Sequence, residues 1–294
     1  MTTEPRGWID LSGGVRLKVS GTDSLRYLNG QVSNDVRKIT PGTAFWACIT
    51  SHKGKLEALV TIAKQDDGVF YVAASPALRD FLPLRLEKYA IADDVLITDV
   101  SDATSQLHFL GAPPPVTPRW QIQAVQRLGA PGCDVWTAPE HLAELKALAP
   151  EIPAETAEWL RIDRGIPAWG TELSGDILPP EAGLDQFAVD YHKGCYIGQE
   201  VISRLKSVGR VNRLLQRLEL LSGAPAQPGW KLFTATGECR EAGVLTSVAA
   251  GSHASAQKTV ALGYLRRDCI APSARFFAAP APGHFLATFT LRNT

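Results

Sequence analysis

One short segment of the chain combines the residue types that thiol chemistry requires. Residues 193–200 read KGCYIGQE, which puts the thiol of Cys195 between the cation Lys193 and the amide of Gln199. A cysteine becomes reactive when a nearby positive charge, a helix N-terminus and exposure to solvent lower its pKa. A helical run from Gln199 to Leu205 follows at once, and its N-terminal amides would favour a thiolate. The segment therefore predicts a working thiol at Cys195, with Lys193 and Gln199 as its catalytic neighbours.

The alternative is that Cys195 is an inert core residue, because free cysteine is most often a small buried hydrophobe. The lysine and the two glycines, Gly194 and Gly198, favour the reactive interpretation, since a core position needs none of them. A reactive thiol could be a nucleophile or redox group, one ligand of a cluster shared with another chain, or a docking residue. It could not hold an iron–sulfur cluster alone, because such clusters take four protein ligands.

The whole chain has the composition of an ordinary soluble globular protein. Its 294 residues are 45% hydrophobic and 20% charged, and the formal net charge is zero. A neutral chain argues against direct binding of nucleic acid. Five separated cysteines without a Cys-X-X-Cys pair argue against disulfides and metal sites, and indicate a reducing, cytoplasmic location. No apolar run reaches membrane-spanning length, so no membrane contact is expected.

The pattern of apolar residues predicts an α+β fold. Strand-like runs cover 15–20, 45–50, 56–63, 69–74, 95–100 and 120–125, and helical runs cover 24–29, 76–90, 138–149 and 155–164. The proline-rich stretch 113–118 indicates a linker. From about residue 209, short alternating runs broken by glycine and proline are typical of a small antiparallel β-barrel, with a last strand at 284–291. We therefore expect three domains, at 1–112, 119–207 and 208–294.

These segments, in this order, resemble the YgfZ family of folate-binding proteins. That family is related to the glycine-cleavage T-protein, a tetrahydrofolate-dependent aminomethyltransferase. KGCYIGQE carries the resemblance most specifically, and LNGQVSNDV at 28–36, RIDRGIP at 161–167, LPPEAGL at 178–184 and ALGY at 261–264 support it. The resemblance implies a ring of three domains around a central folate-sized hole. It also implies a role in maintaining iron–sulfur enzymes, including those that thiolate tRNA.

The chain departs from the T-protein where the latter carries a pair of aspartates that position folate for one-carbon transfer. Ala58 and Leu59 fall nearest to that pair, and neither side chain accepts a hydrogen bond. Glu57 is one residue away and would face the other side of the strand unless a β-bulge shifts the register. An ordinary aminomethyltransferase activity is therefore not expected.

The resemblance also assigns two charged residues to folate. Arg161 matches the arginine that meets the carboxylate of the folate tail, and a guanidinium suits that partner because it binds bidentately. The alternative for Arg161 is a position on a helix surface. Asp134 takes the place of the glutamate that binds the pterin ring, and a turn residue is the alternative.

Three further residues are candidates for the folate pocket. Glu181 lies in a loop shared with the T-protein, but it could instead cap the following turn. Asn29 could line the hole or satisfy turn backbone. Tyr196, with Trp169 and Phe187, is an aromatic candidate for the pterin slot, although aromatic residues are more often part of the core.

A run of cations without an intervening acid follows the thiol segment; it comprises Arg204, Lys206, Arg210, Arg213 and Arg217. Such runs are usually solvated faces. Because this one follows the thiol segment directly, it could also hold a polyglutamate tail or an acidic partner. The six histidines show no metal-ligand spacing, so no metal is expected.

We therefore expect a tetrahydrofolate-binding accessory protein in iron–sulfur cluster assembly or repair, which would support tRNA modification indirectly. Its partners would be folate and iron–sulfur proteins or their assembly factors. One alternative is a folate-dependent aminomethyltransferase or related one-carbon transferase, which turnover of an aminomethyl donor would reveal. A second alternative is a ligand-free interaction module, which a filled central hole would favour.

Overall fold

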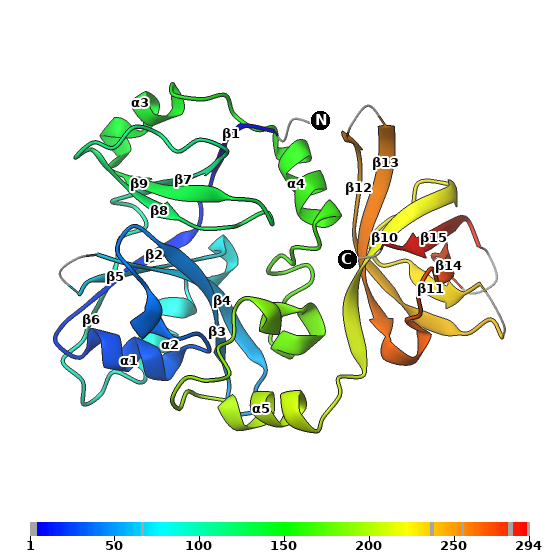
Figure 1. Cartoon of the computed structure of the whole chain (residues 1–294), viewed down its shortest axis with the longest axis horizontal. Helices are drawn as coiled ribbons and strands as arrows, with labels where there is room; N and C mark the ends of the chain where they lie inside the picture. The colour runs from blue at the N-terminus through cyan, green and yellow to red at the C-terminus, as the bar shows by residue number, and fades with distance from the viewer. Residues whose placement is uncertain (1–4, 66–67, 236–237, 254–255, 282–284, 293–294) are drawn as a thin grey trace.

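The structure of the chain, a computed structural model, describes residues 5–65, 68–235, 238–253, 256–281 and 285–292. Two antiparallel sheets with their covering helices lie on one side of the molecule, and a closed β-barrel lies on the other (Figure 1). The mixed α and β architecture and the C-terminal antiparallel barrel confirm the fold class that the sequence predicts.

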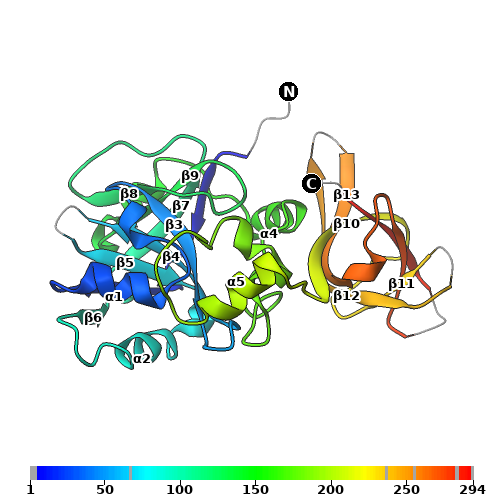
Figure 2. The same ribbon diagram turned by 60° about the horizontal axis from the view of Figure 1, so that its bottom comes forward.

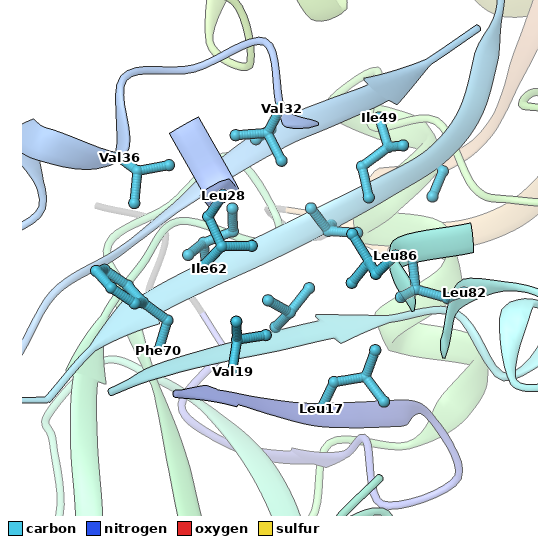
Figure 3. Packing of buried hydrophobic residues seen from close by; sticks show 14 of the residues in the cluster. Leu17, Val19, Leu28, Val32, Val36, Ile49, Ile62, Phe70, Leu82 and Leu86 are labelled. Carbon is cyan, nitrogen blue, oxygen red and sulfur yellow. The ribbon is translucent and has the colours of Figure 1, made fainter. Parts of the chain in front are cut away.

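The larger sheet has five strands in the order β3-β4-β5-β2-β6. Their bounds are Ala44–Thr50, Leu56–Lys64, Phe70–Ala74, Val15–Ser20 and Leu96–Asp99, close to the predicted ranges. The sequence Asp66-Asp67-Gly68 also indicates a turn, which lies partly outside the described residues. Helices α1 (Ser24–Gln31) and α2 (Leu82–Glu87) cover one face of this sheet. Figure 3 shows Leu28 and Leu86 of these helices over Val19, Ile62 and Phe70 of the strands.

The smaller sheet has four strands in the order β1-β7-β9-β8. Their bounds, in that order, are Gly7–Asp10, Ser105–Leu110, Gly132–Thr137 and Trp120–Ala124. Helix α3 (Leu142–Lys146) follows β9 in the chain. The sequence patterns did not predict β1, β7 or β9. Because β1 and β7 precede the irregular stretch 113–118 and β8 and β9 follow it, this sheet joins the first two predicted domain ranges. The three-domain division stays a prediction.

Two predicted helices are shorter in the structure. The run 76–90 splits into a 3₁₀ turn at Pro76–Leu78 and helix α2, with Pro83 in the first turn of α2. Proline is tolerated there because its missing N–H would have no partner in the helix. The run 138–149 likewise divides into a 3₁₀ turn at Pro139–His141 and α3.

The barrel closes in the strand order β10-β13-β12-β11-β14-β15. Its strands span Arg213–Gly223, Ala256–Arg266, Glu241–His253, Lys231–Thr234, Arg275–Ala279 and Ala287–Leu291. The last strand begins later than predicted, and His284 lies outside the described residues. Helix α4 (Ala154–Asp163) packs Trp159 and Leu160 against Val260 and Leu262 of the barrel.

The segment between α4 and the barrel is mostly irregular. It contains short 3₁₀ turns at Pro179–Ala182 and Leu184–Gln186, and it ends in helix α5 (Gln199–Ser207). Figure 2 brings α5 to the front, between the sheets and the barrel. The predicted helix after KGCYIGQE is thereby confirmed.

The start of α5 packs against the turn between β3 and β4. Gly198 has a φ of 86°, and a Cβ added there would lie 2.4 Å from the carbonyl oxygen of Ser51. Gly194, the other glycine of the segment, has open space around it and an ordinary φ. Of these two glycines, only Gly198 is therefore at a position where the fold requires glycine.

Replacing Gly198 with alanine should lower the free energy of unfolding by about 1–3 kcal/mol, because the left-handed backbone and the contact with Ser51 are both strained. Gly194→Ala is the matched control and should change it by less than about 0.5 kcal/mol. Chemical denaturation of both variants measures the difference. Equal effects would contradict this account of the turn.

Candidate functional site

The thiol of Cys195 is exposed, and the residues around it adopt irregular backbone just before α5. Gln199 is the first residue of α5, and its side-chain nitrogen lies 3.5 Å from the carbonyl oxygen of Lys193. Glu200 and Arg204 form the predicted pair one turn apart, at 2.6 Å. The structure thus presents the thiol at the surface rather than in the core, as the reactive interpretation requires.

Lys193 is buried, with 5% of its surface exposed. Its ammonium group donates hydrogen bonds to the carbonyl oxygens of Asn29, Val32 and Asn34, at 2.6–2.8 Å. Desolvation lowers the pKa of Lys193 to about 8. An ammonium group has three hydrogens, so these three acceptors engage all of them. Lys193 therefore fastens the thiol segment to the end of α1, a role the sequence did not reveal, and its predicted effect on the thiolate stays a prediction.

Three predicted pocket residues make contacts within the fold. The side-chain oxygen of Asn29 accepts a hydrogen bond from the N–H of Val36 at 3.0 Å. Glu181 accepts one from the N–H of Leu178 at 3.0 Å, which is the capping alternative. Tyr196 is buried and its hydroxyl has no hydrogen-bond partner among the described residues. Burial raises the pKa of that phenol.

Two adjoining cavities lie where the sheets meet the segment after α4, with volumes of about 380 and 300 Å³. Their shared walls are Trp46, Leu59, Arg127, Ile166 and Pro167. We call them together the central cavity. Trp169 lines the larger part and Phe187 the smaller part, whereas Asn29, Glu181, Asp134 and Tyr196 line neither. Of the charged residues predicted to bind folate, Arg161 is in the wall.

Arg127 is a cation of the central cavity that the sequence did not single out. Its guanidinium lies 5.0 Å over the ring of Trp46 and pairs with Asp134 through Nε and Nη2, at 2.6–2.9 Å. Nη2 also donates to Thr61 of β4, so this arginine joins the two sheets. Nη1 has no hydrogen-bond partner among the described residues, and it is therefore available to an anion. Nothing in the local sequence around Arg127, a single arginine after a strand, indicates that it could bind an anion.

Asp134 lies in β9 and is buried, so it is a strand residue and not the turn residue considered as an alternative. Besides Arg127, its carboxylate accepts hydrogen bonds from His108 at 2.9 Å and Gln106 at 2.8 Å. Burial by itself would raise the pKa of Asp134, but Arg127 and His108 outweigh it and lower the pKa to about 2. Asp134 thus does not line the cavity itself, but it fixes the orientation of the Arg127 guanidinium.

All the N–H donors of Arg161 are bonded within the protein. Its five N–H groups donate to Glu158 twice, to the carbonyl of Ile166, to Glu172 and to Ser247 of β12, at 2.6–2.9 Å. A guanidinium has five such donors, so none is left for a ligand unless a partner is released. Its role in binding the folate tail stays a prediction.

The strand β4 carries the β-bulge on which the role of Glu57 depends. Ile49 pairs with Ala58 and Thr50 with Leu56, which leaves Glu57 without a partner across the strands. Its carboxylate binds Arg85 of α2, on the helix-covered face of the sheet. Leu59 lines the central cavity instead. The carboxylate among the described residues lining that cavity is Asp10, and it pairs with Lys146 at 2.7 Å.

Within the described ranges, no group of three histidine, cysteine, aspartate or glutamate side chains could hold a metal ion. In the same part of the chain, no helix is long and apolar enough to span a membrane.

The carboxylate of Asp134 should make stability depend on pH in the acid range. The folded state keeps it ionised at pH values where the unfolded chain, with a pKa of 3.8, takes up a proton. Its contribution is complete above that value and is lost as the pH falls toward 2. The free energy of unfolding should fall between about pH 6 and about pH 3 by about 1 kcal/mol more in the wild type than in Asp134→Asn. Denaturant titrations at both pH values measure this, and an equal fall would contradict it; the exposed Asp176→Asn is the control.

Comparisons with known proteins agree with this architecture. The model of the GCVT N-terminal domain family matches residues 1–114. A tRNA-modifying protein YgfZ from Klebsiella pneumoniae is 28% identical over 221 residues, which cover 68% of this chain and 67% of that protein. A second one, from Cronobacter sakazakii, is 26% identical over 80% of this chain and 77% of its own.

Aminomethyltransferases are similar to about the same degree. One from Halalkalibacterium halodurans is 26% identical over 77% of this chain and 71% of its own. The crystal structure of the glycine cleavage system aminomethyltransferase T from Bartonella henselae superposes with a TM-score of 0.84 at 17% identity, over 99% of this chain and 86% of that one. That structure establishes the shared fold. The family model, the named relatives and the shared fold together support a protein of the YgfZ/GcvT superfamily.

Proposed function

We propose that this protein binds tetrahydrofolate and acts as an accessory factor in iron–sulfur cluster assembly or repair, with Cys195 as its working thiol. In this role it supports tRNA modification indirectly, in the cytoplasm, and its partners are iron–sulfur proteins or their assembly factors. Relatives named as tRNA-modifying proteins support the biological setting. The observation that carries the proposal is the central cavity, which has aromatic walls and an available cation but Leu59 where a transferase needs a carboxylate.

The central cavity has the groups that a folate requires. Trp46, Trp169 and Phe187 offer flat apolar surfaces for a pterin ring. The free Nη1 of Arg127 offers charge-assisted hydrogen bonds to a carboxylate or a ring oxygen. Because Asp134 and Trp46 hold Arg127 from two sides, little side-chain entropy is lost when a ligand binds. Arg127 is therefore a better anchor than Arg161, whose donors are occupied.

Cys195 acts from a separate position in this proposal. Lys193 anchors the thiol segment (residues 193–200) to the fold. The thiol of Cys195 is therefore held at the surface, although the backbone around it is irregular. An exposed thiol near the first turn of a helix can be reached by a partner protein. This suits a thiol that exchanges with, or lends a ligand to, a cluster on another chain.

The second candidate is an aminomethyltransferase, which relatives of that name favour. Against it, Glu57 is bound to Arg85 on the opposite face of the sheet, and Leu59 cannot accept a hydrogen bond. Fold alone does not establish the activity. A ligand-free interaction module has less support, because the central cavity is open rather than filled.

Tetrahydrofolate should raise the melting temperature, since a ligand at about 100 times its Kd stabilises the folded state by about 2.7 kcal/mol. Phe187→Ala should weaken binding about fivefold, because it removes apolar contact worth about 1 kcal/mol. Phe81→Ala is the matched control: both side chains are 41% exposed, but Phe81 does not line the cavity. No shift in the wild type at saturating ligand would refute folate binding.

Cys195→Ser should abolish complementation of a strain that lacks its own copy, measured as the activity of an iron–sulfur enzyme. Cys239→Ser is the control, because Cys239 is also an exposed free thiol but lies in the barrel region. Tetrahydrofolate binding should be unchanged in both variants. Full complementation by Cys195→Ser would remove the thiol from the mechanism and leave the folate proposal standing.

A further inference from the structure

The run of cations after the thiol segment divides into two groups in the structure. Arg204 pairs with Glu200, Arg213 pairs with Glu181, and Arg217 donates to the carbonyl of Asp163. Lys206 and Arg210 have no ion-pair partner among the described residues. The fold brings a third such cation beside them, Arg267, from the 3₁₀ turn Arg267–Cys269 after β13. This grouping is invisible in the sequence, because Arg267 is distant along the chain.

These three cations line a cavity of about 370 Å³. Its walls come from the 3₁₀ turns around Gly183, the last turn of α5 and the start of β10, and we call it the α5 cavity. Asp185 is the carboxylate in its wall; burial raises its pKa, and the charge of Lys206 opposes that shift. Three cations against one carboxylate leave the cavity positively charged, so it attracts an anion.

Tyr191 adds an aromatic ring to the wall of the α5 cavity. Its hydroxyl is buried without a hydrogen-bond partner among the described residues, and its side chain lines the α5 cavity. The ammonium group of Lys206 lies 5.0 Å from its ring. Leu205, Val211 and Leu214 add apolar wall for the body of such a molecule.

We propose that the α5 cavity is a second ligand site, which binds a small molecule through a carboxylate or phosphate group held by Lys206, Arg210 and Arg267. A bound anion would connect the end of α5 to the barrel, because Arg210 and Arg267 come from the two sides. The α5 cavity and the central cavity have no lining residue in common. The proposal is therefore independent of folate binding.

Isothermal titration calorimetry of the full chain with inorganic phosphate and with glutarate tests the site. At least one probe should bind saturably with one-to-one stoichiometry, and the tighter probe identifies the oxyanion. Arg210→Ala and Arg267→Ala should each weaken that binding about tenfold, as expected for a charge-assisted hydrogen bond. Absence of saturable binding by both probes would overturn the proposal.

Arg266→Ala is the matched control, because Arg266 is exposed, adjacent to Arg267 and already paired with Asp268. It should leave binding unchanged; an equal loss in this variant would mean diffuse attraction and no site.

Discussion

The hydrogen bonds of the Arg161 guanidinium are the interaction on which the placement of the barrel and one wall of the central cavity depend. The guanidinium connects α4 to the loop at Ile166 and Glu172 and to Ser247 in the barrel. A buried cation is tolerated only when its donors are satisfied, and here each N–H has an acceptor. One side chain therefore fixes three segments and one wall of the central cavity. Because the N–H groups of Arg161 are all bonded, Arg127, with its unbonded Nη1, is the better binding partner for a ligand anion.

Lys193 follows the same physical rule at the thiol segment. It forms no direct ion pair among the described residues, although the charges of Asp35 and Asp190 act on it, and three backbone carbonyls near the end of α1 solvate it. Such carbonyls would otherwise need water or other donors, so the lysine and the segment stabilise each other. The most specific motif in the sequence is thus partly structural: its cation and Gly198 position the loop, and Cys195 is left exposed.

Local patterns predicted what depends on neighbouring residues. The strands β3 and β4 with their turn, helix α5 and the alternating strands of the barrel each follow from a few adjacent residues. The four-stranded sheet was missed because β1 is short and pairs with β7, so that Gly7 lies opposite Leu110, far along the chain. The sequence allows a β-bulge at Glu57, but it does not reveal that the carboxylate of Glu57 binds Arg85 on another element.

The sequence predicted which kinds of residue form the site, but it did not predict the contacts that these residues make. The resemblance led to Arg161 in the cavity wall, but the saturation of its donors requires Glu172 and Ser247, which only the folded chain brings together. Arg127 could not be found, because its role follows from Asp134 and Trp46 on different sheets. Long-range contacts, which local patterns do not encode, decide which arginine keeps an unbonded N–H group for a ligand.

A crystal structure of the protein with tetrahydrofolate tests the central claim most directly. The account predicts the pterin ring in the central cavity among Trp46, Trp169 and Phe187, and a ligand oxygen on Nη1 of Arg127, with the bonds of Arg161 to Glu172 and Ser247 intact. Folate bound by Arg161 with those bonds released, or a central cavity left empty at saturating ligand, would contradict it.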